Sequence, residues 1–211
     1  RETQDDFALT SLARAKTAIE DGTFDPEVTP VTVKTRKGEV TVERDEQPLK
    51  AAPEKIRTLK PAFAKDGTVT PANSSSISDG AAALVLMRRS VAEKRGLAPL
   101  AVIRGHATHA HEPCWFTTAP VGAMQKLADK VGWDLKDIDL FEINEAFAVV
   151  TMAAMRDLDL PHDKVNVHGG ACALGHPIGA GEIRPDQGGC VLVYRRRRGD
   201  GRGGRAHHLN T

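Results

Sequence analysis

Two loops between residues 137 and 180 constrain the fold of this chain more than any other feature. The first, Asn144-Glu145-Ala146-Phe147-Ala148, follows the apolar run Ile138–Ile143, and the second, a glycine-rich run over 169–179, follows Val165–Val167. Short apolar runs bounded by polar residues or glycines are typical of buried strands. The sequence therefore predicts two strands, each of which ends in a loop.

The segment that joins the two loops has the pattern of a helix. Residues from Glu145 to Leu158 contain no internal Pro or Gly, and their apolar positions recur at helical spacing. In open α/β sheets, ligand-binding and catalytic groups collect at the carboxyl ends of strands. We therefore expect both loops to face one pocket.

Taken singly, the residues of these loops have ordinary structural interpretations. An Asn after a strand is commonly a helix cap, and Asn144 lies where such a cap is expected. His168-Gly169-Gly170 is similar to the oxyanion strand of α/β-hydrolases, but the chain contains no G-x-S-x-G sequence. The glycine-rich loop also lacks the Gly-Lys-Ser/Thr ending of a phosphate-binding loop. Neither hydrolase nor nucleotide-binding chemistry is therefore indicated.

The composition narrows the possible functions. The chain has 211 residues, 40% of them hydrophobic, and a formal net charge of +1, which argues for neither a nucleic-acid nor a membrane partner. No apolar run approaches the ~18 residues that a membrane helix needs, and we expect no signal peptide. Three cysteines at irregular spacing exclude a disulfide framework and a standard zinc site. A cytoplasmic location is expected.

Taken together, the two loops resemble the thiolase family. Asn-Glu-Ala-Phe-Ala, followed about twenty residues later by V-N-V-H-G-G-A-C-A-L-G-H-P-I-G-A, is similar to the C-terminal half of a thiolase, most closely the biosynthetic type, the acetyl-CoA acetyltransferases. The resemblance covers about residues 1–180. It implies an α/β, thiolase-like fold in which helices cover a mixed five-stranded sheet. Residues 1–80 are then the end of the N-terminal and loop domain that covers coenzyme A, and residues 81–180 the thiolase C-terminal domain.

The resemblance implies that Asn144 and His176 are catalytic. Thiolases join or cleave acyl groups on coenzyme A through an acyl-cysteine and an enolate, and the enolate needs donors where negative charge develops. In the family, the Asn amide fixes a water in such an oxyanion site. The His activates the nucleophilic thiol and helps to hold the thioester oxygen, which suits an imidazole with a pKa near neutrality.

The implied reaction condenses two acetyl-CoA to acetoacetyl-CoA, or runs in reverse as thiolysis. Coenzyme A thioesters are the expected substrates, with no further cofactor and no nucleic-acid or membrane partner. Full-length relatives are dimers or tetramers, so a homodimer or homotetramer is expected for the parent protein.

The resemblance also implies a set of substrate-binding residues. Phe63 and Ser75 would line the pantetheine-binding surface, and Phe116 would lie near the acyl group. Ala146 and Phe147 would pack against the acyl or pantetheine arm. Without the family context, a serine-rich stretch such as the one around Ser75 is usually a solvated turn.

Other residues of the glycine-rich loop have expected supporting roles. Gly175 and Pro177 are expected to hold the His176 ring rigidly, and Gly169-Gly170 to let the backbone come close to the substrate. Cys172 is expected to pack in the interior.

Local patterns predict elements in the rest of the chain. A helix is expected from Thr3 to Gly22, and alternation on both sides of Lys37-Gly38 predicts a hairpin. Further elements are an apolar run over 81–87, helices over 90–95 and 118–131, and a strand that begins at Val102. His106, His109 and His111 cluster on one stretch, but no carboxylate or thiolate pattern completes a metal site, so no metal is expected.

The two cysteines that thiolases use are not matched. The family's nucleophile lies in its N-terminal half, and none of Cys114, Cys172 and Cys190 has its context. Together with a first residue that is Arg1 rather than Met, this predicts a fragment. A catalytically inactive, acyl-CoA-binding thiolase-like fragment is the alternative function.

The second reactive cysteine of the family lies in a C-x-G-G-G loop, and residues 181–211 carry an Arg- and Gly-rich sequence in its place. One choice of codons for Val193–Gly201, read one nucleotide later, encodes Cys-Ile-Gly-Gly-Gly-Glu-Ala-Thr. We therefore hypothesise a frameshift near residue 181 and expect residues 181–211 to be an aberrant tail without native packing, which leaves the C-terminal part of the fold disrupted. A disordered basic tail that contacts nucleic acid or anionic lipid is the alternative.

Overall fold

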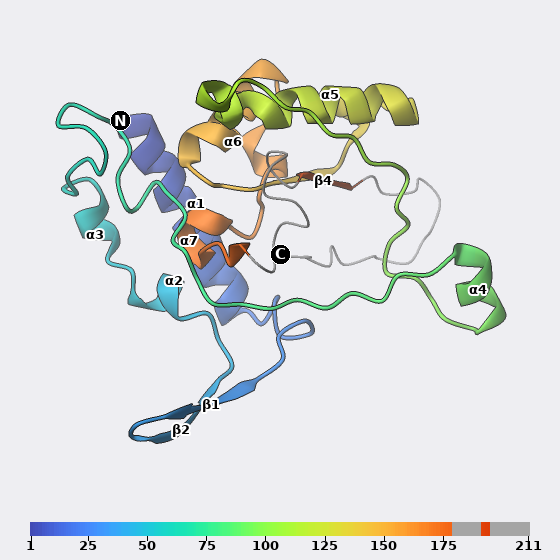
Figure 1. The fold of residues 1–211 in the computed structure, drawn as a ribbon, viewed down its shortest axis with the longest axis horizontal. Coiled ribbons are helices and arrows are strands. Elements are labelled where there is room, and N and C mark those ends of the chain that lie inside the picture. Colours follow the sequence, from blue (N-terminus) through green and yellow to red (C-terminus); the bar gives the residue numbers. More distant parts are fainter. Residues whose placement is uncertain (179–190, 195–211) are drawn as a thin grey trace.

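Helix α1, Glu2–Glu20, is the element around which the rest of the chain is arranged (Figure 1). The computed structural model describes residues 1–178 and 191–194. The sequence of α1 contains neither Gly nor Pro, and its first turn carries acidic residues, which the helix dipole favours. The helix predicted from Thr3 is confirmed and begins one residue earlier. Its buried apolar side chains are Phe7, Ala8, Leu12, Ala15, Ala18 and Ile19.

Four shorter helices pack against α1. They are α2 (Glu46–Lys50), α3 (Pro53–Ile56), α6 (Ala148–Asp157) and α7 (Ala171–Leu174). The first two come from the segment after the hairpin, and the last two flank the predicted loops. α1 therefore brings the two ends of the described sequence together.

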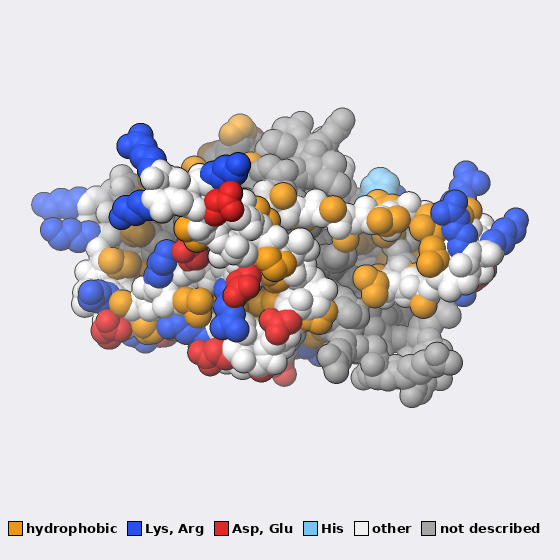
Figure 2. Space-filling view, turned by 90° about the horizontal axis from the view of Figure 1, so that it is seen from below, with side chains coloured by type: hydrophobic (Ala, Val, Ile, Leu, Met, Phe, Trp, Pro, Cys, Tyr) orange, Lys and Arg blue, Asp and Glu red, His pale blue; other side chains and the backbone are white. Residues whose placement is uncertain are grey.

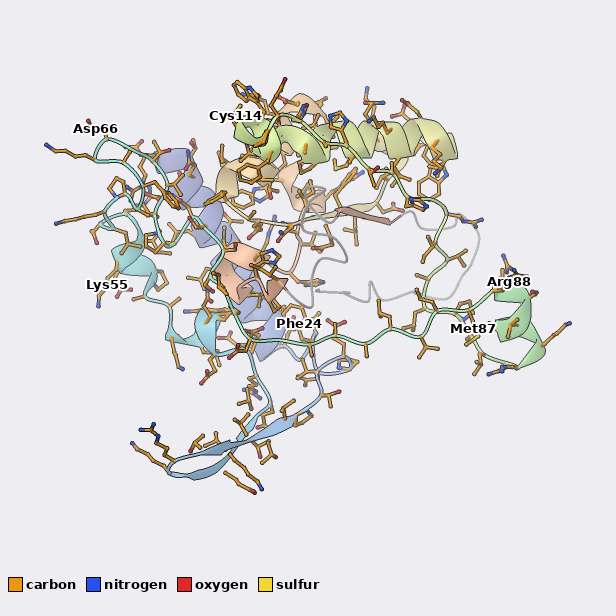
Figure 3. All side chains as sticks on the ribbon, viewed as in Figure 1. Phe24, Lys55, Asp66, Met87, Arg88 and Cys114 are labelled. Carbon is orange, nitrogen blue, oxygen red and sulfur yellow. The ribbon has the colours of Figure 1, made fainter. Side chains whose placement is uncertain are left out.

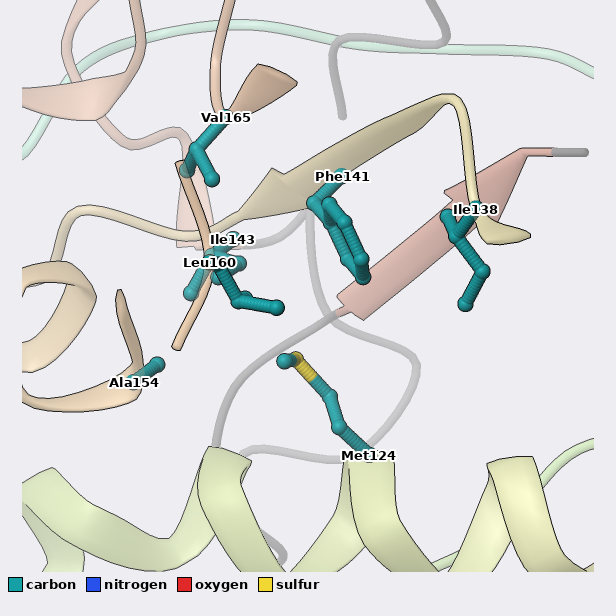
Figure 4. Packing of buried hydrophobic residues seen from close by; sticks show 7 residues of the cluster. All are labelled: Met124, Ile138, Phe141, Ile143, Ala154, Leu160 and Val165. Carbon is teal, nitrogen blue, oxygen red and sulfur yellow. The ribbon is translucent and has the colours of Figure 1, made fainter. Parts of the chain in front are cut away.

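The main apolar core lies between strand β3, Leu140–Ile143, and helices α5, Ala119–Val131, and α6 (Figure 4). Phe141 projects from the strand toward Met124 of α5, and both side chains are almost fully buried. Burial of one such side chain contributes roughly 1.5–3 kcal/mol. The cluster comprises Met124, Ile138, Phe141, Ile143, Ala154, Leu160 and Val165.

The predicted mixed five-stranded sheet is not observed. The described residues hold two separate two-stranded sheets, β1–β2 and β3–β4. The run 81–87 and the segment from Val102 form no ladder, and Val165 makes only an isolated parallel bridge to Phe141. A strand needs a neighbour for its backbone hydrogen bonds. No neighbouring strand flanks these segments in the described part of the chain.

Strand β4, Val191–Tyr194, pairs antiparallel with β3, from Leu140 opposite Tyr194 to Ile143 opposite Val191. These four residues, which belong to the tail expected to lack native packing, therefore form a ladder with β3, and the expectation about packing stays a prediction. The apolar, β-branched sequence Val-Leu-Val-Tyr suits a strand. The remainder of the expected tail lies outside the described residues.

The predicted hairpin is confirmed as β1, Val31–Thr35, and β2, Gly38–Val42. It projects away from the helices (Figure 1), and every residue in both strands is exposed. Val31 pairs with Val42 and Val33 with Val40, so four valines share one face.

The remaining elements follow their local sequence patterns. α5 begins at Ala119 with Pro120 in its first turn, where Pro is tolerated, and ends before Gly132, whose φ is +69°. The helix predicted from Glu145 begins instead at Ala148. The other elements are helix α4 (Arg89–Lys94) and 3₁₀ turns at Pro113–Thr118, Leu135–Asp137 and His162–Lys164.

A long exposed excursion, residues 79–112, carries α4 away from the body of the molecule and is called the α4 arm below (Figures 1 and 3). Met87 and Arg88 lie at its far end (Figure 3). Figure 2 shows hydrophobic side chains and Lys or Arg side chains together on this side of the molecule. Within the described residues, no helix is both long and apolar enough to span a bilayer.

Candidate active site

The structure brings Asn144 and His176 together. Asn144 follows β3 directly, and its amide nitrogen lies 3.5 Å from Nε2 of His176, at the outer limit of hydrogen-bonding distance. Both side chains are half-buried. Asn144 is not the cap of α6, because that helix begins at Ala148. The residue at the N-cap position is Phe147, which makes no side-chain cap hydrogen bond. The structural alternative for Asn144 is therefore excluded.

The serine-rich stretch 73–78 connects the two loops through its backbone. On one side, Ala148 N donates to Asn73 O at 2.9 Å and Ser75 N donates to Ala146 O at 3.1 Å. On the other side, His176 N donates to Ser76 O at 2.8 Å. This stretch is a strut rather than a solvated turn, and it fixes the backbone of both loops.

Ser75 has a structural partner. Its hydroxyl donates to Ala146 O at 3.2 Å, so it reinforces the backbone bond beside it. Its predicted contact with pantetheine stays a prediction, as does that of Ala146, whose carbonyl accepts both bonds.

Gly175 is required for the approach of this strut to His176. Its φ is +89°, and a Cβ at this position would lie 2.1 Å from Ser78 Oγ. A larger residue would push the His176 backbone off the strut. The expectation that Gly175 fixes the ring thus has a steric basis.

Glu145 lies at the centre of the site and was not predicted. Its side chain is fully buried, and its carboxylate accepts three hydrogen bonds from three parts of the chain. Asn166 Nδ2 donates to Oε1 at 2.8 Å. Ser11 Oγ and Cys172 N donate to Oε2 at 2.8 and 3.1 Å. One carboxylate therefore connects α1, the chain after Val165 and the start of α7.

Burial controls the ionisation of the two carboxyl groups near the site. Burial raises the pKa of Glu145, against the effect of its hydrogen bonds to Asn166, Ser11 and Cys172. Burial also raises the pKa of Glu142 to about 8, with a further rise from Glu145 and an opposing effect of Arg14. Glu142 therefore tends to carry a proton near neutral pH.

The glycine pair lies close against α1 and Glu145. A Cβ on Gly169 would lie 2.6 Å from Ser11 O and 2.8 Å from Ala15 Cβ. A Cβ on Gly170 would lie 2.5–2.8 Å from the carboxylate atoms of Glu145. Gly169 and Gly170 therefore let the loop approach α1 and the buried carboxylate, and the expected approach of their backbone to the substrate stays a prediction.

Three of the predicted apolar binding residues cluster on the surface. The Phe63 and Phe116 rings lie 6.2 and 6.3 Å from the Phe147 ring, each edge to face. Phe63 is 77% exposed and Phe116 49% exposed. Exposed aromatic rings that touch one another are a suitable surface for an apolar ligand arm.

The expectation that Cys172 packs in the interior is confirmed. Cys172 is buried beside Phe7 and Ala148, and burial raises the pKa of its thiol well above the ordinary value. A buried thiol of this kind is inert as a nucleophile. Cys114 is exposed, and Cys190 lies outside the described residues. His109 stacks edge to face on His111, with ring centroids 4.5 Å apart, and no metal-binding cluster of three or more ligands is present in the described ranges.

Three residues that organise the site were missed from the sequence. Asn166 has a positive φ of 47°, and its side chain bonds both N and O of Ile143, at 2.8 Å each. Arg14 donates to Val165 O at 2.7 Å. The sequence carried only weak signals for these roles. Glu145 is an acidic residue beside an apolar run, and Asn166 is of a residue type that tolerates left-handed backbone.

Family comparison accounts for these motifs. The family description "Thiolase, N-terminal domain" matches residues 1–90, and "Thiolase, C-terminal domain" matches residues 97–201. This chain belongs to the thiolase family. The second match continues past residue 180, the point at which the motif resemblance ends.

Among curated thiolase relatives, this chain is 49% identical over 185 residues to a probable acetyl-CoA acetyltransferase of Dictyostelium discoideum. It is 47% identical over 186 residues to a probable acetyl-CoA acyltransferase of Staphylococcus aureus. The alignments cover 87% of this chain but only 45% and 47% of the two relatives. The chain thus spans about half the length of the thiolases that it matches.

Solved thiolase structures share its fold. The acetyl-CoA acetyltransferase of Bacillus anthracis matches with a TM-score of 0.82 and 47% identity, over 85% of this chain and 46% of that one. The Acat5 thiolase of Ascaris suum, crystallised with coenzyme A, matches with a TM-score of 0.80 and 44% identity, over the same shares. Human mitochondrial 3-ketoacyl-CoA thiolase matches with a TM-score of 0.75 and 40% identity, over 84% of this chain and 45% of that one. The thiolase-like fold class is therefore confirmed, although residues 1–178 and 191–194 do not form the five-stranded sheet.

Proposed function

We propose that this chain contributes half of the catalytic machinery of an acetyl-CoA C-acetyltransferase. The reaction is the condensation of two acetyl-CoA to acetoacetyl-CoA and coenzyme A, or the reverse thiolysis. The observation that carries the proposal is the approach of Asn144 and His176, which lie 3.5 Å apart on two separate loops. Two isolated structural residues would have no reason to converge.

The two side chains suit complementary steps. The His176 imidazole can take the proton of a cysteine thiol and return it later, because its charge change lies near neutral pH. The Asn144 amide is an N–H donor for a water or for the oxygen on which enolate charge develops. The thiol itself would come from the thiolase N-terminal half.

Coenzyme A is the proposed ligand of the adjoining surface. The exposed Phe63 and Phe116 rings and the half-buried Phe147 ring offer an apolar face for the pantetheine or acyl arm. Ser75 lies on the strut and donates to Ala146, which precedes Phe147 in the first loop. The Ascaris suum relative was crystallised with coenzyme A, which supports this assignment. A homodimer or homotetramer is proposed for the full-length protein on the same family grounds, and a cytoplasmic location is proposed from its few, irregularly spaced cysteines.

A chimera tests the proposal. Residues 1–178 of this chain replace the matched segment of the Bacillus anthracis acetyl-CoA acetyltransferase, and thiolysis of acetoacetyl-CoA is followed spectrophotometrically. We expect turnover comparable to that of the parent enzyme. His176→Ala and Asn144→Ala should each lower kcat about 100-fold or more, because each removes a group that acts in the transition state.

Thr32→Ala, on the exposed hairpin, is the matched control and should leave kcat unchanged. A folded chimera that binds coenzyme A in a calorimeter without turnover would favour the alternative function, an inactive acyl-CoA-binding fragment. Full turnover in the His176→Ala chimera would refute the catalytic assignment.

A further inference from the structure

Glu145 occupies a position from which it can act on both catalytic side chains. It directly follows Asn144, so one peptide bond links its backbone to that of Asn144. Its Oε2 accepts the Cys172 N–H in the first turn of α7, and α7 leads through Gly175 to His176. The same carboxylate thus belongs to one catalytic loop and holds the other.

We propose that Glu145 is a positioning residue, whose buried carboxylate sets the separation of Asn144 and His176. This inference rests on the proposed function, because positioning has meaning only if the two side chains act together. Glu145 touches no substrate in this assignment. It acts through the loops that it joins.

The arrangement around the carboxylate is more specific than packing requires. Burial of a carboxylate costs several kcal/mol unless it is fully hydrogen-bonded, and an apolar side chain of similar volume would fill the space at lower cost. Here three donors converge on two oxygens, and the serine donor is itself bound by Gly170 N at 3.0 Å. Every partner also adjoins one of the loops or helix α1. The cost of burial is therefore offset by bonds that fix loop geometry.

The partners extend this control to the backbone on both sides. Asn166, which donates to Glu145, also bonds the main chain of Ile143, the residue before Asn144. Gly170 leaves no room beside the carboxylate, because the three atoms nearest to a Cβ there would be Glu145 atoms, at 2.5–2.8 Å. A shift of the carboxylate would therefore move both loops.

Three variants perturb this carboxylate in different ways. Glu145→Gln keeps the shape but turns one acceptor into a donor, which must then face another donor. Gly170→Ala displaces the carboxylate and leaves its chemistry intact; its φ of −154° is open to Ala. Ser11→Ala removes one donor. Glu39→Gln is the matched control, since it makes the same change of side chain on the exposed hairpin, away from both loops.

The first measurement uses the full chain and nuclear magnetic resonance. In the native protein we expect a cross-peak between the Asn144 side-chain amide and the His176 ring. Glu145→Gln and Gly170→Ala should abolish it and shift both sets of signals, while the Met124 core signals stay in place. Ser11→Ala should give a smaller shift in the same signals. Glu39→Gln should leave the cross-peak intact.

The second measurement uses the active chimera. Glu145→Gln and Gly170→Ala should lower kcat about 10–100-fold with KM changed less than about threefold, because misplacement by a fraction of an ångström impairs the transition state more than binding. A purely structural role would instead lower the amount of folded enzyme at unchanged kcat. Glu145→Asp should recover part of the rate by restoring the charge.

The failures of the two proposals are distinguishable. If Asn144→Ala and His176→Ala leave the chimera active, the proposed function fails, whatever Glu145 does. If those variants are inactive but folded Glu145→Gln and Gly170→Ala retain both kcat and the cross-peak, the positioning role is overturned. If Glu145→Gln does not fold, Gly170→Ala and Ser11→Ala test the positioning role instead. The two measurements are the cross-peak between Asn144 and His176 and the kcat of the chimera.

Discussion

At the scale of single residues, the buried carboxyl groups around β3 determine how this chain responds to pH. Burial raises the pKa of Glu142 from 4.5 to about 8, so the folded state binds a proton that the unfolded chain has released. Between these two values the native state holds more protons than the unfolded state. Its free energy of unfolding therefore decreases as pH rises from about 4.5 to about 8.

Glu142→Gln should remove this pH dependence. Each unit of pKa shift corresponds to about 1.4 kcal/mol, and solvent screens part of this effect. We therefore expect the free energy of unfolding of the variant to exceed that of the native chain by about 1–2 kcal/mol at pH 9. Near pH 4 the two should be equal. Urea unfolding at both pH values measures the difference. Glu39→Gln on the exposed hairpin is the control, and an equal gain there would contradict the assignment.

At the scale of elements, helix α1 contacts the segments of the site through buried polar side chains as well as through its apolar ones. Its buried Asp5 accepts from Asn73 of the strut at 3.1 Å. Ser11 reaches Glu145, and Arg14 donates to carbonyls of the segment before the glycine-rich loop. These contacts tie one helix to all three segments that build the site. Since each is directional, α1 fixes orientation as well as distance.

Gly169→Ala tests the close approach of the glycine-rich loop to α1. The substitution adds a methyl group within 2.6 Å of Ser11 O at a positive φ of +84°, so both sterics and backbone oppose it. We expect a loss of about 3 kcal/mol or more in the free energy of unfolding.

Gly132→Ala is its matched control. Gly132 also has a positive φ, +69°, but a Cβ there would meet nothing within 4 Å. It should cost only about 1 kcal/mol, which is the backbone strain alone. Equal losses in the two variants, by chemical denaturation, would show that the contact with α1 contributes nothing.

At the scale of the whole molecule, the α4 arm leaves apolar surface uncovered. Val85 is 87% exposed and Ile103 73% exposed, and within residues 79–112 only Ala92 is buried. Extended apolar segments without ladder partners favour association between chains. The thiolases that share this fold are about twice as long, and this chain matches 46% of the Bacillus anthracis structure.

Charged substitutions on the arm should reduce that association. Val85→Lys together with Ile103→Lys removes two exposed apolar side chains, so we expect less binding of a hydrophobic dye and less aggregation on heating. The free energy of unfolding should change by less than about 0.5 kcal/mol. Thr32→Lys with Thr41→Lys adds the same charge on the hairpin as a control. If that control suppresses aggregation equally, net charge rather than the arm is responsible.

Local sequence patterns were sufficient to predict several helices and the hairpin of this protein. The absence of Gly and Pro predicts α1, Pro120 and Gly132 bound α5, and Lys37-Gly38 sets the hairpin, because each depends on residues within one or two turns. The two loop motifs likewise predicted that Asn144 and His176 would meet.

Tertiary structure decided what depends on distant partners. Glu145 gained its place only because Ser11 and Asn166, far apart in sequence, converge on it, and this contact holds residues 145–147 out of the helix that starts at Ala148. The glycine pair faces α1 for the same reason. The described residues do not form the expected five-stranded sheet, because a strand is completed by a neighbour and not by its own sequence.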